Sequence, residues 1–177
     1  MSVNSASDLI AYNGEDALSE ISIRPKNLED SDWIEQLLVR EWGSKMIVSR
    51  GILHDATGVP AFIAKLDGKP VGLATYRFDE NQCELLTLNS ERENLGVGTA
   101  LVNAVSGSAR EKNCKRLWLI TSNDNLNAVR FYQKRGFALA CVHRNAMHLS
   151  RKLKPSIPEI GIDGIPLRDE IEMELLL

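Results

Sequence analysis

Hydrophobic and polar residues follow a period of two along several short stretches of this chain, and that period predicts β-strands. The predicted strands, one of them mainly apolar, are residues 20–24, 61–65, 71–77, 83–88, 116–121, 137–143 and 170–175. The dipeptide Asp67-Gly68 between the second and third stretches predicts a hairpin turn. In the last stretch the alternation brings three glutamates onto one face, which we expect to be wet and to discourage pairing with other molecules.

Apolar residues at helical spacing predict three helices between these strands. The helices cover residues 31–42, 98–112 and 125–135. Gly43 and Gly136 follow two of them, as is typical where a helix ends. Residues 44–59 show no clear period, and a loop or a second short helix is expected around residues 49–55. This order of elements predicts an α+β fold built on a mixed sheet.

Length and composition indicate one globular domain. We place it at residues 19–177 of the 177-residue chain, after a loose tail over residues 1–18. Residues 154–168 are rich in Pro and Gly but also contain four isoleucines, so an ordered loop is expected before the final strand. No apolar run approaches the roughly 18 residues of a membrane span. A net charge of −3 argues against binding to nucleic acid.

The remaining composition suggests a cytoplasmic protein. The first residues have neither a basic start nor an apolar stretch, so a secretory signal is not expected. The cysteines, Cys83, Cys114 and Cys141, lack C-x-x-C spacing and are expected to be reduced, buried thiols. The histidines have no mutual spacing that suggests a metal site, and none is expected.

A glycine turn between a strand and a helix is the first feature that carries chemistry. Gly96-Val97-Gly98 follows the strand over 83–88 and leads into a helix. Unpaired N–H groups at the positive end of a helix suit a phosphate. Alone, the glycine turn is only weak support for a phosphate-binding site. The fingerprint of a dinucleotide fold, its main competitor, requires a third small residue where Leu101 stands, and there is no Gly-Lys-Ser/Thr for a nucleoside triphosphate.

A second motif makes the pattern specific. It reads Asn125-x-x-Ala128-x-x-Phe131-Tyr132-x-x-x-Gly136-Phe137. With the strand Leu86-Thr-Leu88 and the glycine turn, the chain resembles the GNAT superfamily of N-acyltransferases over about residues 20–150, together with the final strand. One position departs from the family pattern: Glu93 stands where the family usually has Arg or Gln. An acidic group would repel a pyrophosphate, so either Glu93 turns outward or the adjacent Arg92 takes over that role.

The resemblance implies a single-domain fold with acetyl-CoA as co-substrate and no metal. A mostly antiparallel sheet of six to seven strands would be flanked by about four helices. It would splay between its fourth and fifth strands, 83–88 and 116–121, to admit the pantetheine arm. The residues expected to bind acetyl-CoA are Leu86, Leu88, Asn94, Leu95, Gly96, Val97, Gly98, Thr99, Asn125, Ala128 and Phe131.

The resemblance also implies catalytic roles. Tyr132 occupies the family's position for the acid that protonates the leaving thiolate; the alternative is a tyrosine packed under the sheet. Asn125 would bind the pantetheine, cap the helix, or do both. Glu84 is the candidate base, since strand alternation gives it the parity of Leu86 and Leu88; the alternative is a charged residue at a wet strand start. A backbone N–H freed by a bulge near Leu88 would polarise the carbonyl.

The acceptor is the least defined part of the expected function. Trp42, Arg50 and His54 lie on the segment that commonly walls the acceptor pocket in this family, which makes them weak candidates for substrate contacts. We expect transfer of acetyl to a primary amine by direct attack. Polyamine, aminoglycoside, amino acid, peptide N-terminus and protein lysine all stay open, and a homodimer is common in the family. The alternative is a non-catalytic module that binds acyl-CoA.

Overall fold

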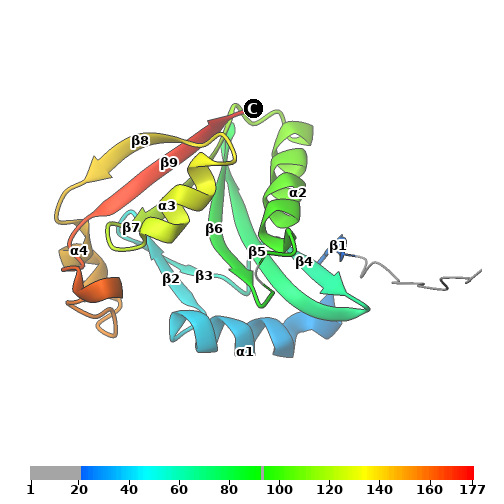
Figure 1. Cartoon of the computed structure of the whole chain (residues 1–177), viewed down its shortest axis with the longest axis horizontal. Coiled ribbons are helices and arrows are strands. Elements are labelled where there is room, and N and C mark those ends of the chain that lie inside the picture. The colour runs from blue at the N-terminus through cyan, green and yellow to red at the C-terminus, as the bar shows by residue number, and fades with distance from the viewer. Residues whose placement is uncertain (1–20, 93) are drawn as a thin grey trace, which may run out of the picture.

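The computed structural model describes residues 21–92 and 94–177 (Figure 1). The predicted tail over residues 1–18 and Glu93 lie outside the described residues. The described strands form one seven-stranded sheet and one separate hairpin. In spatial order the main sheet contains β1 (Ile21–Pro25), β4 (Ala61–Leu66), β5 (Lys69–Asp79), β6 (Gln82–Ser90), β7 (Arg116–Ser122), β9 (Glu170–Leu176) and β8 (Ala138–His143).

The pairing between β6 and β7 is parallel, and the other neighbouring strands of the sheet run antiparallel. The described α-helices are α1 (Ser31–Trp42), α2 (Val97–Glu111), α3 (Leu126–Gln133) and α4 (Ala146–Leu153), with short 3₁₀ turns η1 (Leu28–Asp30) and η2 (Ile162–Gly164). The predicted α+β fold with a mixed, mostly antiparallel sheet is therefore confirmed.

Helices cover both faces of the sheet (Figure 1). The larger core lies where α2 packs on the sheet, and a smaller core lies beneath α1 on the other face. Gly72 on β5 allows α2 to approach closely, because a Cβ there would lie 2.6 Å from Cγ1 of Val97. This contact fixes the start of α2, the end that carries the glycine turn.

The segment after α1 forms a hairpin. Strands β2 (Met46–Ser49) and β3 (Ile52–Asp55) pair through a two-residue turn at Arg50-Gly51. Both turn residues have positive φ, +49° and +71°, as the tight hairpin turns require. The expected loop or short helix around residues 49–55 is therefore wrong, because Gly51 sets a turn between two short apolar stretches.

Helix α4 was not predicted. Its buried residues, Met147 and Ser150, lie about one turn apart and face the protein, while most of its other residues are exposed. The helix begins after Asn145, which has a φ of +60° and makes no side-chain cap hydrogen bond. A helix with only two buried positions and no capping side chain leaves little periodic signal in the sequence.

Of the three glutamates of β9, Glu170 and Glu172 do not face water, whereas Glu174 is partly exposed. The strand lies between β7 and β8, and Glu170 and Glu172 are only 3% and 5% exposed. Glu172 accepts hydrogen bonds from Arg116 and His143, and Glu170 accepts one from Ser150. The predicted wet face is wrong for these two residues because the polar side of the strand is covered there and their carboxylates accept hydrogen bonds inside the protein.

Residues 154–168 run along the body of the protein. Arg151 donates to the carbonyl oxygen of Pro158 at 2.8 Å, and Ile160 forms an isolated bridge with Pro166. Cys83 and Cys114 are buried free thiols, but Cys141 on the edge strand β8 is exposed, which corrects the expectation that it is buried. Among the helices of residues 21–92 and 94–177, none combines the length and apolar character of a membrane span.

Candidate active site

Strands β6 and β7 separate part of the way along their length. Their parallel pairing covers Gln82–Leu85 with Arg116–Leu119 and then ends. Beyond that point β6 pairs only with β5, and β7 only with β9, so the two strands diverge as Figure 1 shows. The predicted splay between the fourth and fifth strands of the main core is confirmed.

A cavity of about 290 Å³, here the gap cavity, lies where the strands diverge. Its lining comes from both strands, from α3 and from the end of α1. The lining residues are Glu41, Trp42, Leu85, Leu86, Thr87, Leu88, Asn89, Leu119, Ile120, Thr121, Asn125, Ala128 and Tyr132. The predicted acetyl-CoA contacts at Leu86, Leu88, Asn125 and Ala128 therefore meet in one space.

A β-bulge bends β6 at this gap. Thr75 of β5 pairs with Thr87, but the next residue, Tyr76, pairs with Leu85. Leu86 is the additional residue, and a bulge leaves backbone groups outside the ladder. The bulge was expected near Leu88 and lies at Leu86, beside the gap cavity.

A second cavity of about 780 Å³, here the arginine cavity, surrounds the start of α2. Gly96 precedes the helix with a φ of +81°, and among residues 21–92 and 94–177 no side chain caps the first turn, so N–H groups of that turn can bind an anion. The lining residues are Ser90, Arg92, Asn94, Gly96, Val97, Gly98, Thr99, Asn127, Arg130, Phe131 and Arg135. Of the predicted contacts here, only Leu95 lies outside the lining; it is half exposed.

Arginines supply the positive charge of this cavity. Arg92 lines it, next to the position of Glu93. Arg130 and Arg135 were missed by the sequence analysis, although both belong to the motif that begins at Asn125. The Arg135 guanidinium donates to Oγ1 of Thr99 at 2.9 Å from Nε and stacks 3.4 Å from the Phe131 ring centroid. Arginine and helix amides together are a suitable site for a pyrophosphate.

Gly98 has a packing reason to be glycine. A Cβ at this position would lie 3.1 Å from Cζ of Phe131 and 3.2 Å from its Cε2. Phe131 also lines the arginine cavity, so the first turn of α2 and this aromatic ring lie close together there.

Tyr132 lies at the gap cavity on α3. It is 7% exposed, and its ring meets the rings of Phe131 and Phe137 edge-on at centroid distances of 5.1 and 5.3 Å. Burial raises the pKa of the Tyr132 phenol, and the positive charge of Arg135 only partly opposes this. The phenol therefore keeps its proton at neutral pH, as a proton donor must.

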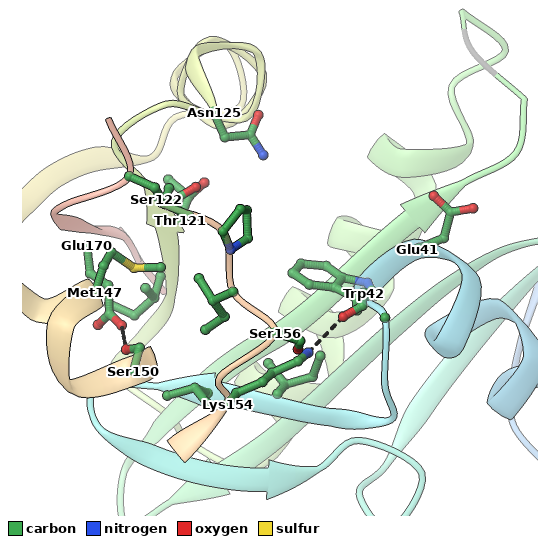
Figure 2. A pocket seen from close by; sticks show the side chains of 17 residues that line it. Glu41, Trp42, Thr121, Ser122, Asn125, Met147, Ser150, Lys154, Ser156 and Glu170 are labelled. Carbon is green, nitrogen blue, oxygen red and sulfur yellow. Dashed lines mark hydrogen bonds between the residues drawn. The ribbon is translucent and has the colours of Figure 1, made fainter. Parts of the chain in front are cut away.

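Asn125 caps a helix and also lines two cavities. Its Oδ1 accepts the N–H of Ala128 at 3.0 Å and so caps α3. The residue also lines the gap cavity and a third cavity, and Figure 2 shows its amide nitrogen directed into the space between them. Capping thus leaves the amide N–H groups free for a ligand.

The third cavity, here the side cavity, has a volume of about 470 Å³ and opens beside the gap cavity (Figure 2). Its lining residues are Glu41, Trp42, Gly43, Ile47, Val48, Ile120, Thr121, Ser122, Asn125, Met147, Ser150, Lys154, Ser156, Ile157, Pro158, Leu167 and Glu170. Trp42 lines both cavities, and its Nε1 donates to Oδ1 of Asn89 at 3.0 Å. Of the three weak substrate candidates, Trp42 lies at a cavity.

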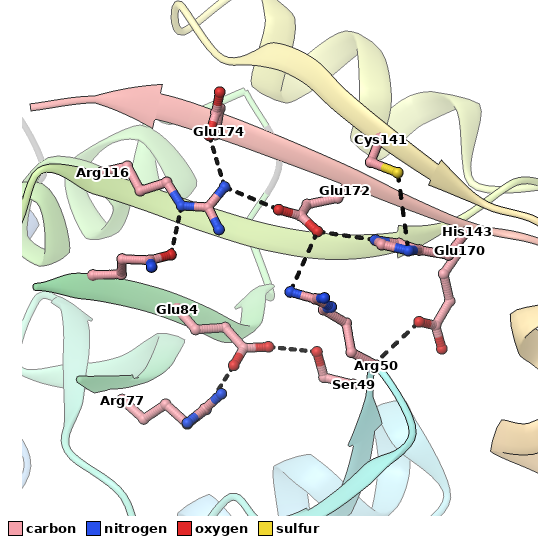
Figure 3. Close-up of polar contacts among 11 residues, drawn as sticks. Ser49, Arg50, Arg77, Glu84, Arg116, Cys141, His143, Glu170, Glu172 and Glu174 are labelled. Atoms are coloured by element: carbon pink, nitrogen blue, oxygen red, sulfur yellow. Dashed lines mark hydrogen bonds and ion pairs between the residues drawn. The ribbon is translucent and has the colours of Figure 1, made fainter. Parts of the chain in front are cut away.

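Glu84 does not lie with the cavity residues. The bulge at Leu86 reverses the alternation, so Leu88 packs in the core beneath α2 while Glu84 faces the β2–β3 hairpin. The parity argument for Glu84 as a base is therefore wrong. The side chain is 1% exposed, accepts a hydrogen bond from Ser49, and forms an ion pair with Nε of Arg77 at 2.6 Å (Figure 3). Both carboxylate oxygens are occupied.

Arg50 and His54 also lie outside the lining of these cavities. The Arg50 guanidinium lies 5.7 Å from the ring centroid of Trp118 and 3.8 Å from Glu172 (Figure 3). His54 has a buried Nε2 without a hydrogen-bond partner in the described part of the chain, and burial lowers its pKa. Neither position supports a direct contact with an acceptor.

Comparison with known proteins identifies the family. The Acetyltransferase (GNAT) family matches residues 18–137. Two uncharacterised proteins of Bacillus subtilis are similar: YdhI is 41% identical over 151 residues, 84% of this chain and 94% of that protein. YxbD is 40% identical over 156 residues, which cover 85% of this chain and 96% of that protein.

A solved GNAT acetyltransferase from Elizabethkingia anophelis with acetyl-CoA bound has a TM-score of 0.65 and 21% identity. The similarity covers 89% of this chain and 98% of that one, and at this identity it supports the fold. The family match spans more than half of the sequence, and both relatives align over most of their length. The chain belongs to the GNAT family of acetyltransferases.

Proposed function

We propose that this protein transfers an acetyl group from acetyl-CoA to a primary amine by direct attack. The observation that carries the proposal is the divergence of β6 and β7 beyond Leu85 and Leu119. It opens the gap cavity between a basic cavity on one side and the largely apolar side cavity on the other. A cofactor with a charged end and a narrow arm fits such a sequence of cavities.

Each part of acetyl-CoA has a counterpart in this arrangement. The free amides at the start of α2, with Arg92, Arg130 and Arg135, would bind the pyrophosphate. The pantetheine arm would lie along the bulged strand β6 in the gap cavity. The thioester would then lie near Asn125 and Tyr132, which line the far end of that cavity.

The chemistry needs a proton donor and a polarised carbonyl. The amine nitrogen attacks the thioester carbon, the C–S bond breaks, and the departing sulfur takes the Tyr132 proton. Donors near the bulge at Leu86 or the Asn125 amide would stabilise charge on the carbonyl oxygen. The amine must lose a proton before or after attack, and Glu84 is a poor base because Arg77 and Ser49 occupy its oxygens.

The ion pair between Glu84 and Arg77 is also the observation that favours the alternative function, a non-catalytic module that binds acyl-CoA. Release of free CoA from acetyl-CoA in the presence of a panel of amines separates the two functions. Acetyl transfer predicts amine-dependent release, whereas binding of acetyl-CoA without release would support the module.

Tyr132→Phe should lower kcat strongly and leave acetyl-CoA affinity nearly unchanged. General acid catalysis contributes about 10²- to 10⁴-fold, which sets the expected loss. Tyr76→Phe is a matched control, because Tyr76 is also buried but its hydroxyl lies 3.4 Å from Ser108 Oγ and outside the cavity linings. Equal rates for the two variants would remove Tyr132 from the mechanism.

A further inference from the structure

The walls of the side cavity are mainly apolar. The apolar side chains that line it are Trp42, Ile47, Val48, Ile120, Met147, Ile157, Pro158 and Leu167. A cavity of about 470 Å³ with such walls suits a small molecule that has an apolar body.

Glu170 places a buried carboxylate at this cavity. The residue is 3% exposed, and its Oε1 accepts the Ser150 hydroxyl at 2.8 Å. Its Oε2 accepts the Arg50 backbone N–H at 3.3 Å. Within residues 21–92 and 94–177, no Lys, Arg or His forms an ion pair with it, whereas the neighbouring Glu172 has three such partners. Two hydrogen bonds orient the carboxylate and leave its charge uncompensated.

A buried charge without a counter-charge is unfavourable, so this site favours a cationic ligand. Its position suits an amine that must reach the gap cavity. Glu170 pairs directly with Ser122 of β7, and the Ser122 carbonyl accepts the N–H of Asn125 at 3.1 Å. The carboxylate thus lies one strand away from the turn whose Asn125 lines both cavities.

The other charged groups of the lining are already engaged. Lys154 donates to the carbonyl oxygens of Trp42 at 2.7 Å and Met46 at 2.9 Å, and burial lowers its pKa (Figure 2). Glu41 is exposed and paired with Arg40 at 2.8 Å. Of the charged side chains described around this cavity, Glu170 is the one that is both buried and without an opposite charge.

We propose that the acceptor is a small primary monoamine with an apolar body, that Glu170 binds its ammonium group, and that the Glu170 carboxylate takes the proton that this nitrogen must lose before it attacks the thioester. The proposal rests on the acetyl-transfer function, because it assigns the acceptor to the side cavity. A second ammonium would lie among mainly apolar walls, and the carboxylate of an amino acid held by its ammonium would lie close to the negative charge of Glu170. Diamines and amino acids should therefore bind more weakly than monoamines.

Calorimetric titration of the CoA-saturated protein with n-alkylamines tests the class of acceptor. From butylamine to octylamine, affinity should rise about fourfold per methylene until the cavity is full. Hexylamine should bind at least about tenfold more tightly than 1,6-diaminohexane, leucine or the neutral hexan-1-ol. Tighter binding of the diamine or of leucine, or equal binding of the alcohol, would overturn the proposal.

Glu170→Gln tests the residue, since glutamine keeps the size and can still accept the Ser150 hydroxyl. Hexylamine affinity should fall about tenfold or more with acetyl-CoA affinity little changed, and Tm should rise or stay the same, because the substitution removes an uncompensated buried charge. Glu35→Gln, a control at an exposed glutamate outside the cavity linings, should change hexylamine affinity less than about twofold. Equal effects of the two substitutions would contradict the role of Glu170. If Glu170→Gln does not fold, the comparison of hexylamine with hexan-1-ol on the unaltered protein decides.

The binding and turnover measurements test the acceptor assignment and the acetyl-transfer function independently. If amines of another class release CoA but hexylamine does not bind, the acceptor assignment is wrong and acetyl transfer stands. If hexylamine binds and the binding depends on Glu170, but no amine releases CoA, then acetyl transfer is wrong and the ammonium site stands.

Discussion

Removing the charge of Arg77 should destabilise the protein through Glu84. The two side chains are joined at 2.6 Å, and Glu84 is 1% exposed. At an effective dielectric constant of about 20, the direct attraction is about 6 kcal/mol, which desolvation largely offsets. Leaving a buried carboxylate unpaired costs about 3–5 kcal/mol. Since the Arg77 side chain is 23% exposed and Ser49 still donates, we expect about 3 kcal/mol for Arg77→Met.

Urea unfolding of four proteins measures this coupling: the unaltered chain, Arg77→Met, Glu84→Gln and the double variant. The double variant should recover about 2 kcal/mol relative to the sum of the single losses, because the unpaired charge is gone. Glu84→Gln should keep kcat within about threefold, since its oxygens are bonded away from the cavities. A loss below about 1 kcal/mol in Arg77→Met, or a kcat loss above about 100-fold in folded Glu84→Gln, would refute this reasoning.

Three further predictions concern the cofactor side and pH. Gly98→Ala should lower the free energy of unfolding by about 1 kcal/mol in urea, because the new Cβ would lie 3.1 Å from the Phe131 ring. Adding Phe131→Leu should relieve part of this loss, and no relief would exclude the clash. Arg135→Met should weaken acetyl-CoA binding about tenfold in titration calorimetry, whereas the exposed Arg110→Met should not; equal effects would place the pyrophosphate elsewhere. Burial raises the pKa of Tyr132 in the folded protein, so the unfolded chain loses the phenol proton at a lower pH than the folded chain does. The free energy of unfolding should therefore hold below about pH 10 and fall above it. Tyr132→Phe should reduce this alkaline loss in urea midpoints, and an unchanged profile would contradict the burial argument.

Local signals predicted the frame of the fold well. Alternation along β4 and β5 with Asp67-Gly68 between them is confirmed as a hairpin, and the glycine turn does begin α2. The hairpin at Arg50-Gly51 was missed because its strands have only four residues each. Glu170 and Glu172 of β9 were misplaced because alternation reports which residues share a face. It does not report what covers that face.

The site was predictable where a motif fixed local geometry. Asn125 and Tyr132 meet at the gap cavity because one short helix carries both, and Asn125 caps it. Glu84 was misassigned because the bulge that was expected near Leu88 lies at Leu86, between Glu84 and Leu88, and so inverts the alternation that had placed these two residues on one face. Glu170 comes from the far end of the chain, so only the pairing of β9 with β7 brings it to the side cavity.

A crystal structure with acetyl-CoA bound tests the central claim most directly. We expect the pantetheine to lie between β6 and β7 beside Leu86, the pyrophosphate to lie against the first amides of α2 and Arg135, and the thioester to lie near the Tyr132 hydroxyl. Acetyl-CoA bound away from this gap, or β6 and β7 hydrogen-bonded to each other beyond Leu85 with the cofactor excluded, would contradict it.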